Sequence, residues 1–278
     1  MISQLTGAIV RAALVMVLIA TPSLMLPGVT TDTTQIVALV AIFAAALTFF
    51  EYASTYPGLV EFRDAPPFNR VRFLSLFVTV LLLSTIVRGA TMPTTLTVFI
   101  EALGNKLGEV IDVPYSPVRL VVLMLPDDMS LRHLLLVRTA AGLSYMISLM
   151  TLIFFIVAMR VIGWPSRIGT FNVWINLPTF DPTTGGDVVE RLQRDARFNI
   201  ALGFLLPFLI PAAVKIAALA FSPVTLESPQ TLIWTMTAWA FLPASLFMRG
   251  IAMGRIAGMI EEKRRLNNAA AESELVPA

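Results

Sequence analysis

Long intervals without a charged side chain constrain this sequence more than any other feature. Twenty such positions separate Arg11 from Asp32, and 21 separate Arg138 from Arg160. A helix needs about 20 mainly apolar residues to cross the hydrocarbon core of a bilayer. These intervals are therefore long enough for membrane-spanning helices, and they recur along the chain.

The composition supports the same interpretation. Apolar residues make up 56% of the 278 residues and charged residues 14%, whereas ordinary soluble domains have about 45–50% and about 25%. We predict an all-α fold, a polytopic membrane helix bundle with about six transmembrane helices and interfacial amphipathic helices. The expected spans are residues 8–27, 35–53, 72–89, 139–161, 200–221 and 231–253.

The distribution of Lys and Arg predicts the orientation. With the N-terminus inside, 14 of these residues lie on the inner side and five on the outer side, and positively charged loops are preferentially retained in the cytoplasm. We expect a single transmembrane domain, residues 1–260, and a cytoplasmic tail, residues 261–278. Both termini are then cytoplasmic. The preference for Arg over Lys, the absence of Cys and the abundant Ala and Leu indicate a bacterial inner membrane.

Three segments are not expected to span the membrane: the outer segment 89–138 and the inner segments 51–72 and 164–199. In the outer segment, apolar residues recur at steps of three and four from Leu96 to Ile111, which predicts an interfacial helix. In the second inner segment, Asp187 precedes an amphipathic stretch and is suited to capping it. We expect this stretch to lie along the inner membrane surface.

The residue inventory excludes most metal and redox chemistry. Cysteine is absent and histidine occurs once, so thiolate sites, iron–sulfur clusters and multi-histidine sites have no ligands. The pI of about 9.2 does not indicate nucleic acid, because the basic residues flank apolar spans. We expect no nucleic-acid partner, no cofactor, no metal and no catalytic residue, and therefore no enzyme.

Lys215 is the most unusual polar residue, because a charged side chain within a span is costly. Pro207 and Pro211 precede it, and each removes a helix hydrogen bond and so frees a backbone carbonyl. One interpretation is ion or proton coupling at a kinked helix. The other, which we favour, is a structural lysine whose ammonium reaches the membrane surface.

A weak polar cluster precedes the fourth span. Asp127, Asp128 and His133 lie close together in the sequence and could in principle bind a divalent cation. The same acidic residues, followed by Ser130, are also typical of the start of a helix. We favour the helix start, since one histidine does not define a zinc or copper site.

Three glycines in and after the sixth span form a ridge of small residues. Gly250, Gly254 and Gly258 recur every four residues, which allows another helix to approach closely. The helix in contact belongs either to this chain or to a partner subunit, and the sequence does not distinguish the two.

Three functions remain open at this point. The leading hypothesis is a non-catalytic accessory, assembly or scaffold subunit of a larger membrane complex, with membrane lipids and either a membrane protein or a second copy of this chain as partners. The second is a small transporter or channel organised around Lys215 and the kinked fifth span. The third is a membrane-embedded enzyme that modifies lipids.

Overall fold

The computed structural model describes residues 2–164, 172–181, 183, 185–221 and 224–274, and in these residues the chain is all-helical. Six helices are long and apolar enough to cross a membrane, which confirms the predicted fold class. Residues 165–171, within the predicted inner segment, and residues 275–278 of the predicted tail lie outside the described residues.

The helices follow one another along the chain, joined by loops of different lengths. They are α1 (Ile2–Met25), α2 (Thr31–Ala53), α3 (Phe68–Gly89), α4 (Thr95–Ile111), α5 (Pro117–Met124), α6 (Leu131–Ile162), α7 (Val173–Asn176), α8 (Val188–Ala217) and α9 (Pro229–Glu274). The six candidate spans are α1, α2, α3, α6, α8 and α9.

Short polar side chains begin most of these helices. Thr30, Thr94, Ser116, Ser130 and Asp187 each accept a hydrogen bond from a backbone N–H in the first turn that follows. The first N–H groups of a helix have no partner within it, so these caps fix where each helix starts.

The sequence predicted that the second inner amphipathic stretch is a separate helix lying along the membrane. This prediction is wrong. Residues 188–199 are the first turns of α8 and continue without a break into the fifth span. Val189, Leu192 and Ala196 are buried in a core cluster shared with α9. Their apolar face is therefore covered by protein, which removes the reason for this stretch to lie flat on lipid.

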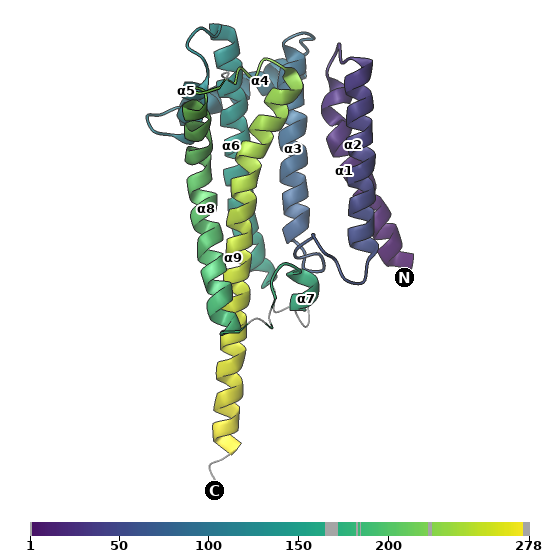
Figure 1. Cartoon of the computed structure of the whole chain (residues 1–278), viewed down its shortest axis with the longest axis vertical. Coiled ribbons are helices and arrows are strands. Elements are labelled where there is room, and N and C mark those ends of the chain that lie inside the picture. Colours follow the sequence, from purple (N-terminus) through teal and green to yellow (C-terminus); the bar gives the residue numbers. More distant parts are fainter. Residues whose placement is uncertain (1, 165–171, 182, 184, 222–223, 275–278) are drawn as a thin grey trace.

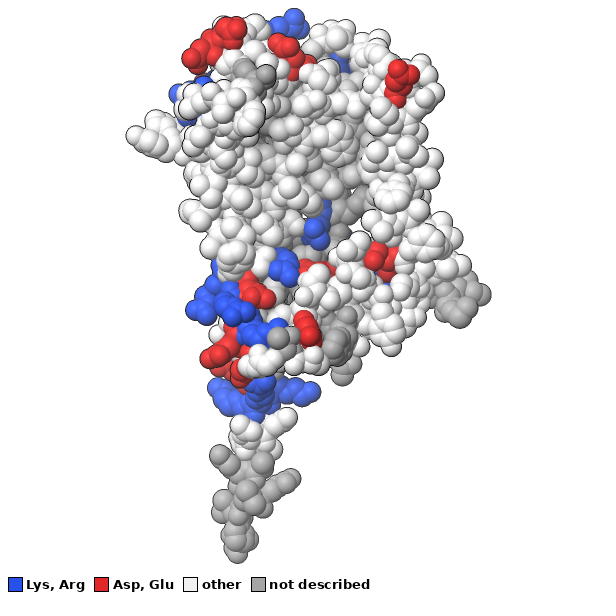
Figure 2. All heavy atoms as spheres, viewed as in Figure 1, with Lys and Arg blue, Asp and Glu red and all other residues white. Residues whose placement is uncertain are grey.

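The helices form a bundle with the α1–α2 hairpin at one side (Figure 1). α8 and α9 pack against each other along most of the bundle, and both termini lie at the same end. α9 continues beyond the bundle as a single helix. An almost uncharged band separates two charged ends (Figure 2), as expected for a protein whose middle faces hydrocarbon. We call the end with both termini the inner end.

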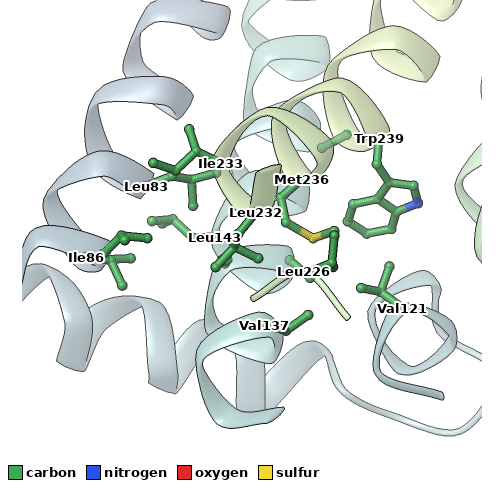
Figure 3. Close-up of a cluster of buried hydrophobic side chains, with 14 of the residues drawn as sticks. Leu83, Ile86, Val121, Val137, Leu143, Leu226, Leu232, Ile233, Met236 and Trp239 are labelled. Atoms are coloured by element: carbon green, nitrogen blue, oxygen red, sulfur yellow. The ribbon is translucent and has the colours of Figure 1, made fainter. Parts of the chain in front are cut away.

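A first apolar core lies toward the outer end, between α3, α5, α6 and α9. Leu83, Ile86, Val137, Met236 and Trp239 belong to it (Figure 3). The short helix α5 contributes Val118 and Val121. The segment 117–124, too short to cross a membrane, therefore packs on the outer parts of the spans.

A second apolar core lies toward the inner end and is rich in aromatic rings. Phe62 from the first inner loop lies 4.3 Å from the ring of Phe68 and 6.0 Å from that of Trp164, between ring centroids. Phe155 of α6 is also in contact with Phe68. The loop between α2 and α3 is thus folded into the bundle, and its backbone is held by Asn176, which bonds the N–H of both Phe62 and Asp64.

The outer amphipathic helix α4 lies against α6 through glycines. A Cβ atom added to Gly142 of α6 would lie 2.4 Å from the Cα of Gly108 in α4, and one added to Gly108 would lie 2.9 Å from the carbonyl oxygen of Arg138. The large residues Leu96, Phe99 and Val110 remain exposed on α4. This helix therefore presents its small face to the protein and its large apolar face outward.

We predict that Gly142→Ala destabilises the fold. The added methyl group meets backbone atoms that cannot rotate away, and overpacking of this kind costs about 1–3 kcal/mol, more than the gain in helix propensity of about 1 kcal/mol. Gly258→Ala is the matched control, since no atom lies within 4 Å of its added Cβ. Thermal unfolding in a mild detergent should show a lower midpoint for Gly142→Ala alone. Equal midpoints would contradict the close α4–α6 crossing.

Candidate functional site

Lys215 lies in the last turn of α8, two residues before the helix ends, and its side chain is exposed. Its ammonium donates a 3.4 Å hydrogen bond to the carbonyl oxygen of Leu125 at the end of α5. Lys215 thus lies near the outer end of the span. It connects α8 to the end of α5, and this contact agrees with a structural role for the side chain.

The kink residues Pro207 and Pro211 are both buried within α8. Pro211 has no N–H to donate to the carbonyl of Pro207, which a regular helix would require. The indole N–H of Trp239 in α9 donates to this carbonyl instead, at 3.1 Å. This freed carbonyl is therefore used to join α8 to α9.

The three glycines of α9 have different surroundings. A Cβ atom added to Gly250 would lie 2.7 Å from the carbonyl oxygen of Ala196 in α8, whereas Gly254 has only Ala196 at 3.7 Å and Gly258 has no atom within 4 Å. Gly203 of α8, which the sequence analysis did not single out, approaches Pro243 of α9 equally closely. The first glycine of the ridge, Gly250, therefore lies in the α8–α9 contact, whereas the last, Gly258, adjoins open space.

The polar cluster near the outer end does not converge on one point. Ser130, not Asp127 or Asp128, caps α6 by accepting from the N–H of His133. The ring of His133 bonds the carbonyl oxygen of Thr225 through Nε2 at 2.9 Å. In the part of the chain that the structure describes, no three His, Cys, Asp or Glu side chains are placed to hold a metal ion.

The strongest polar contact lies at the inner end, between the first inner loop and α9. Arg249 donates to both carboxylate oxygens of Glu61, at 2.6 Å from Nε and 2.8 Å from Nη2, and the two side chains are 25% and 12% exposed. Thr179 donates a third hydrogen bond to Glu61 at 2.7 Å. Because paired Arg–carboxylate bonds are both strong and directional, this contact joins three segments distant in sequence.

A cavity of about 660 Å³ opens next to this contact, between the α1–α2 hairpin, the first inner loop and α3. Its lining includes four arginines and three uncharged polar residues: Arg11, Arg63, Arg70, Arg72, Thr48, Tyr52 and Asn69. The remaining wall is mainly apolar and includes Leu14, Val15, Phe73, Leu74, Leu76 and Phe241. Figure 2 shows a hollow between the bundle and the hairpin, with Lys or Arg atoms beside it.

Arg72 is in contact with two aromatic rings and one amide. It lies 5.3 Å from the ring centroid of Phe68 and 5.8 Å from that of Phe241, and its Nη1 donates a long 3.4 Å bond to Asn69. Its Nε is buried and has no hydrogen-bond partner. Aromatic faces attract a guanidinium, yet they leave this N–H group unsatisfied.

Sequence reasoning missed both the Glu61–Arg249 contact and the arginine-lined cavity. Each depends on residues that come together from different segments, and these residues do not recur at a regular spacing in the sequence. A partial signal existed, since Arg11 and Arg72 adjoin apolar spans and Glu61 lies in a loop with other charges. The glycine contact between α4 and α6 had a clearer signal, because Gly104 and Gly108 are four residues apart.

The part of α9 beyond the bundle is tied to α8 at one point. Arg264 donates to both oxygens of Asp187, the cap of α8, at 3.0 and 2.9 Å. The backbone N–H of Val189 and the Arg264 guanidinium together lower the pKa of the Asp187 carboxyl below its ordinary value. From Glu261 to Ala270 every residue is exposed.

No known protein family, curated protein or solved structure matches this chain.

We predict that Glu61→Gln lowers the free energy of unfolding by about 1.5–3 kcal/mol, the range for hydrogen bonds to charged groups, because Arg249 loses its anion. Glu109→Gln is the control, since its pair with Lys106 is exposed on both sides and such pairs contribute about 0–1 kcal/mol. Chemical unfolding in detergent measures both. Hydrogen exchange should also quicken in residues 54–67 of the Glu61 variant only; equal behaviour of the two variants would contradict the assigned role.

We predict that Arg264→Gln raises the pKa of Asp187 toward its ordinary value, because the guanidinium no longer favours the carboxylate. A carboxyl with a lowered pKa stabilises the fold above its ordinary pKa, and this contribution is lost as the pH falls through the lowered value. Carboxyl-carbon NMR of Asp-labelled protein follows the titration. An unchanged Asp187 pKa in the variant would show that the contact does not persist in solution.

Proposed function

We propose that this protein is a non-catalytic accessory, assembly or scaffold subunit of a larger membrane protein complex. The observation that carries the proposal is the extension of α9, a continuous helix that leaves the bundle with all of its residues from Glu261 to Ala270 exposed (Figure 1). A surface of this kind is suited to contact with another protein, and within it Arg264 also bonds Asp187 of the chain itself.

The extension is a stable helix because it continues a helix that already forms within the bundle. An isolated helix shorter than about 12–15 residues is marginal in water, owing to the cost of forming its first turn, but here that turn already exists within α9. The ten exposed residues extend it by about 15 Å at 1.5 Å per residue. They carry charges of both signs and one large apolar residue, Leu266, which is 59% exposed.

The location that we propose is the bacterial inner membrane, with both termini in the cytoplasm. The excess of Lys and Arg at the inner end supports this orientation, and it places the α9 extension in the cytoplasm. The partner is then a membrane protein with a cytoplasmic face, or a second copy of this chain.

The transporter hypothesis receives less support from the same geometry. Lys215 lies in the exposed last turn of α8, and the carbonyl freed by Pro211 is bonded to Trp239. Neither group is therefore placed to bind a solute within the span, so we rank transport second.

We predict that a chain truncated after Arg265 no longer binds its partner. This truncation keeps the α8–α9 packing and the Arg264–Asp187 contact but deletes Leu266 and the residues after it. The measurement is chemical cross-linking in native membranes, followed by mild solubilisation and size analysis. The full protein should give an assembly larger than the 30.4 kDa chain. Most of the truncated protein should shift to the monomer.

Phe99→Ala, an exposed change at the outer end, is the control and should leave the assembly intact. Leu266→Asp tests the same surface without shortening the chain. A solitary monomer from the full-length protein would overturn the proposed function, and an assembly that survives both tail variants would overturn the role of the extension.

A further inference from the structure

The cavity beside the α1–α2 hairpin carries positive charge that the protein does not neutralise. Among the residues that the structure describes, Arg11, Arg70 and Arg72 form no ion pair with a carboxylate. Arg63, the fourth arginine in the lining, is paired with Asp64 at 3.1 Å. Three cations therefore border one cavity of about 660 Å³.

The carboxylates in this region have other partners. Glu51 accepts hydrogen bonds from the backbone N–H groups of Gly58, Leu59 and Val60, and Glu61 is held by Arg249 and Thr179. Neither acid forms an ion pair with Arg11, Arg70 or Arg72, so an anion from outside the chain would be the first directly bonded anionic partner of these arginines.

Arg72 provides the second, independent observation. Its Nε–H group is buried without a partner, and an unsatisfied buried donor on a charged group is costly. A guanidinium donates through Nε and Nη in a fork that matches two oxygens of a phosphate. Because Arg72 lines the cavity, a phosphate group there would give its guanidinium a charge-assisted partner and compensate the charge.

The rest of the wall indicates that the ligand is a lipid. Leu14 and Val15 of α1 and Phe73, Leu74 and Leu76 of α3 line the cavity, and these residues belong to candidate membrane spans. A soluble phosphate would leave this apolar wall without a partner, whereas an acyl chain covers it. Basic pockets between spans near the cytoplasmic surface are suited to acidic lipid headgroups.

We propose that this cavity binds one anionic phospholipid. The phosphate lies among Arg11, Arg70 and Arg72, and an acyl chain lies between the α1–α2 hairpin and α3. The bound lipid then lies at the border between the α1–α2 hairpin and α3, where the cavity opens. This inference does not depend on the proposed scaffold role.

Native mass spectrometry of the full chain tests the proposal. The purified protein in detergent is titrated with dioleoyl phosphatidylglycerol or with dioleoyl phosphatidylcholine, which has the same chains and no net charge. We expect the first lipid to bind at least about tenfold more tightly and one molecule to resist removal by detergent. In Arg72→Gln this preference should fall about tenfold, as the loss of a charge-assisted hydrogen bond predicts.

Arg160→Gln is the matched control, an exposed arginine at the inner end of α6 and away from the cavity, and it should keep the preference. Arg72→Lys, which keeps the charge but loses the fork, should fall between the wild type and Arg72→Gln. Arg11→Gln and Arg70→Gln test the same cavity if Arg72→Gln does not fold. Circular dichroism and the midpoint of thermal unfolding establish that each variant is folded.

Three results would overturn the proposal. Equal binding of the two lipids would show only nonspecific lipid contact, and an unchanged preference in the folded cavity variants would place the anionic lipid elsewhere. Displacement of phosphatidylglycerol by millimolar inorganic phosphate, with no effect of chloride at the same ionic strength, would show that the cavity takes a free phosphate and not a lipid.

Discussion

Polar backbone groups that face hydrocarbon have to find partners within the protein, and the rest of this structure depends on that constraint. It selects helices for every span, and a proline within a helix leaves a carbonyl that a donor from another segment can satisfy. Pro211 leaves such a carbonyl in α8, and Trp239 of α9 donates to it. The proline in one helix is therefore matched by a donor in its neighbour, and α8 and α9 have the most extensive helix contact in the described chain.

Close approach between helices stabilises a fold within a membrane, as hydrophobic burial stabilises a fold in water. Lipid tails are as apolar as leucine, so helices associate in a membrane through tight packing and a few hydrogen bonds. Gly108 and Gly142 bring α4 onto α6, while Gly203 and Gly250 bring α8 onto α9. The α1–α2 hairpin has less of this packing, since α2 buries only Ala41 and Ala45, and the cavity lies along its border with α3. A lipid in that cavity would complete the contact.

The inner end combines charge with aromatic packing. Glu61 and Arg249 join the first inner loop to α9, and Phe62 from the same loop is fully buried between Phe68 and Trp164. This rigid inner end holds the base of α9, from which the exposed extension projects. The cavity and the extension are thus separate surfaces on one support.

The sequence by itself determined the fold class, the six spans and the approximate ends of most of them, because the spacing of charges and the apolar composition are local and periodic. It also indicated the small faces of α9, but not that Gly250 contacts α8 while Gly258 has no neighbour. Only the tertiary structure decided that residues 188–199 belong to α8, that Glu61 pairs with Arg249, and that Arg11, Arg70 and Arg72 share a cavity. The physical reason is that these contacts join residues far apart along the chain. The packing of whole helices sets which faces meet, and no pattern within a single helix specifies it.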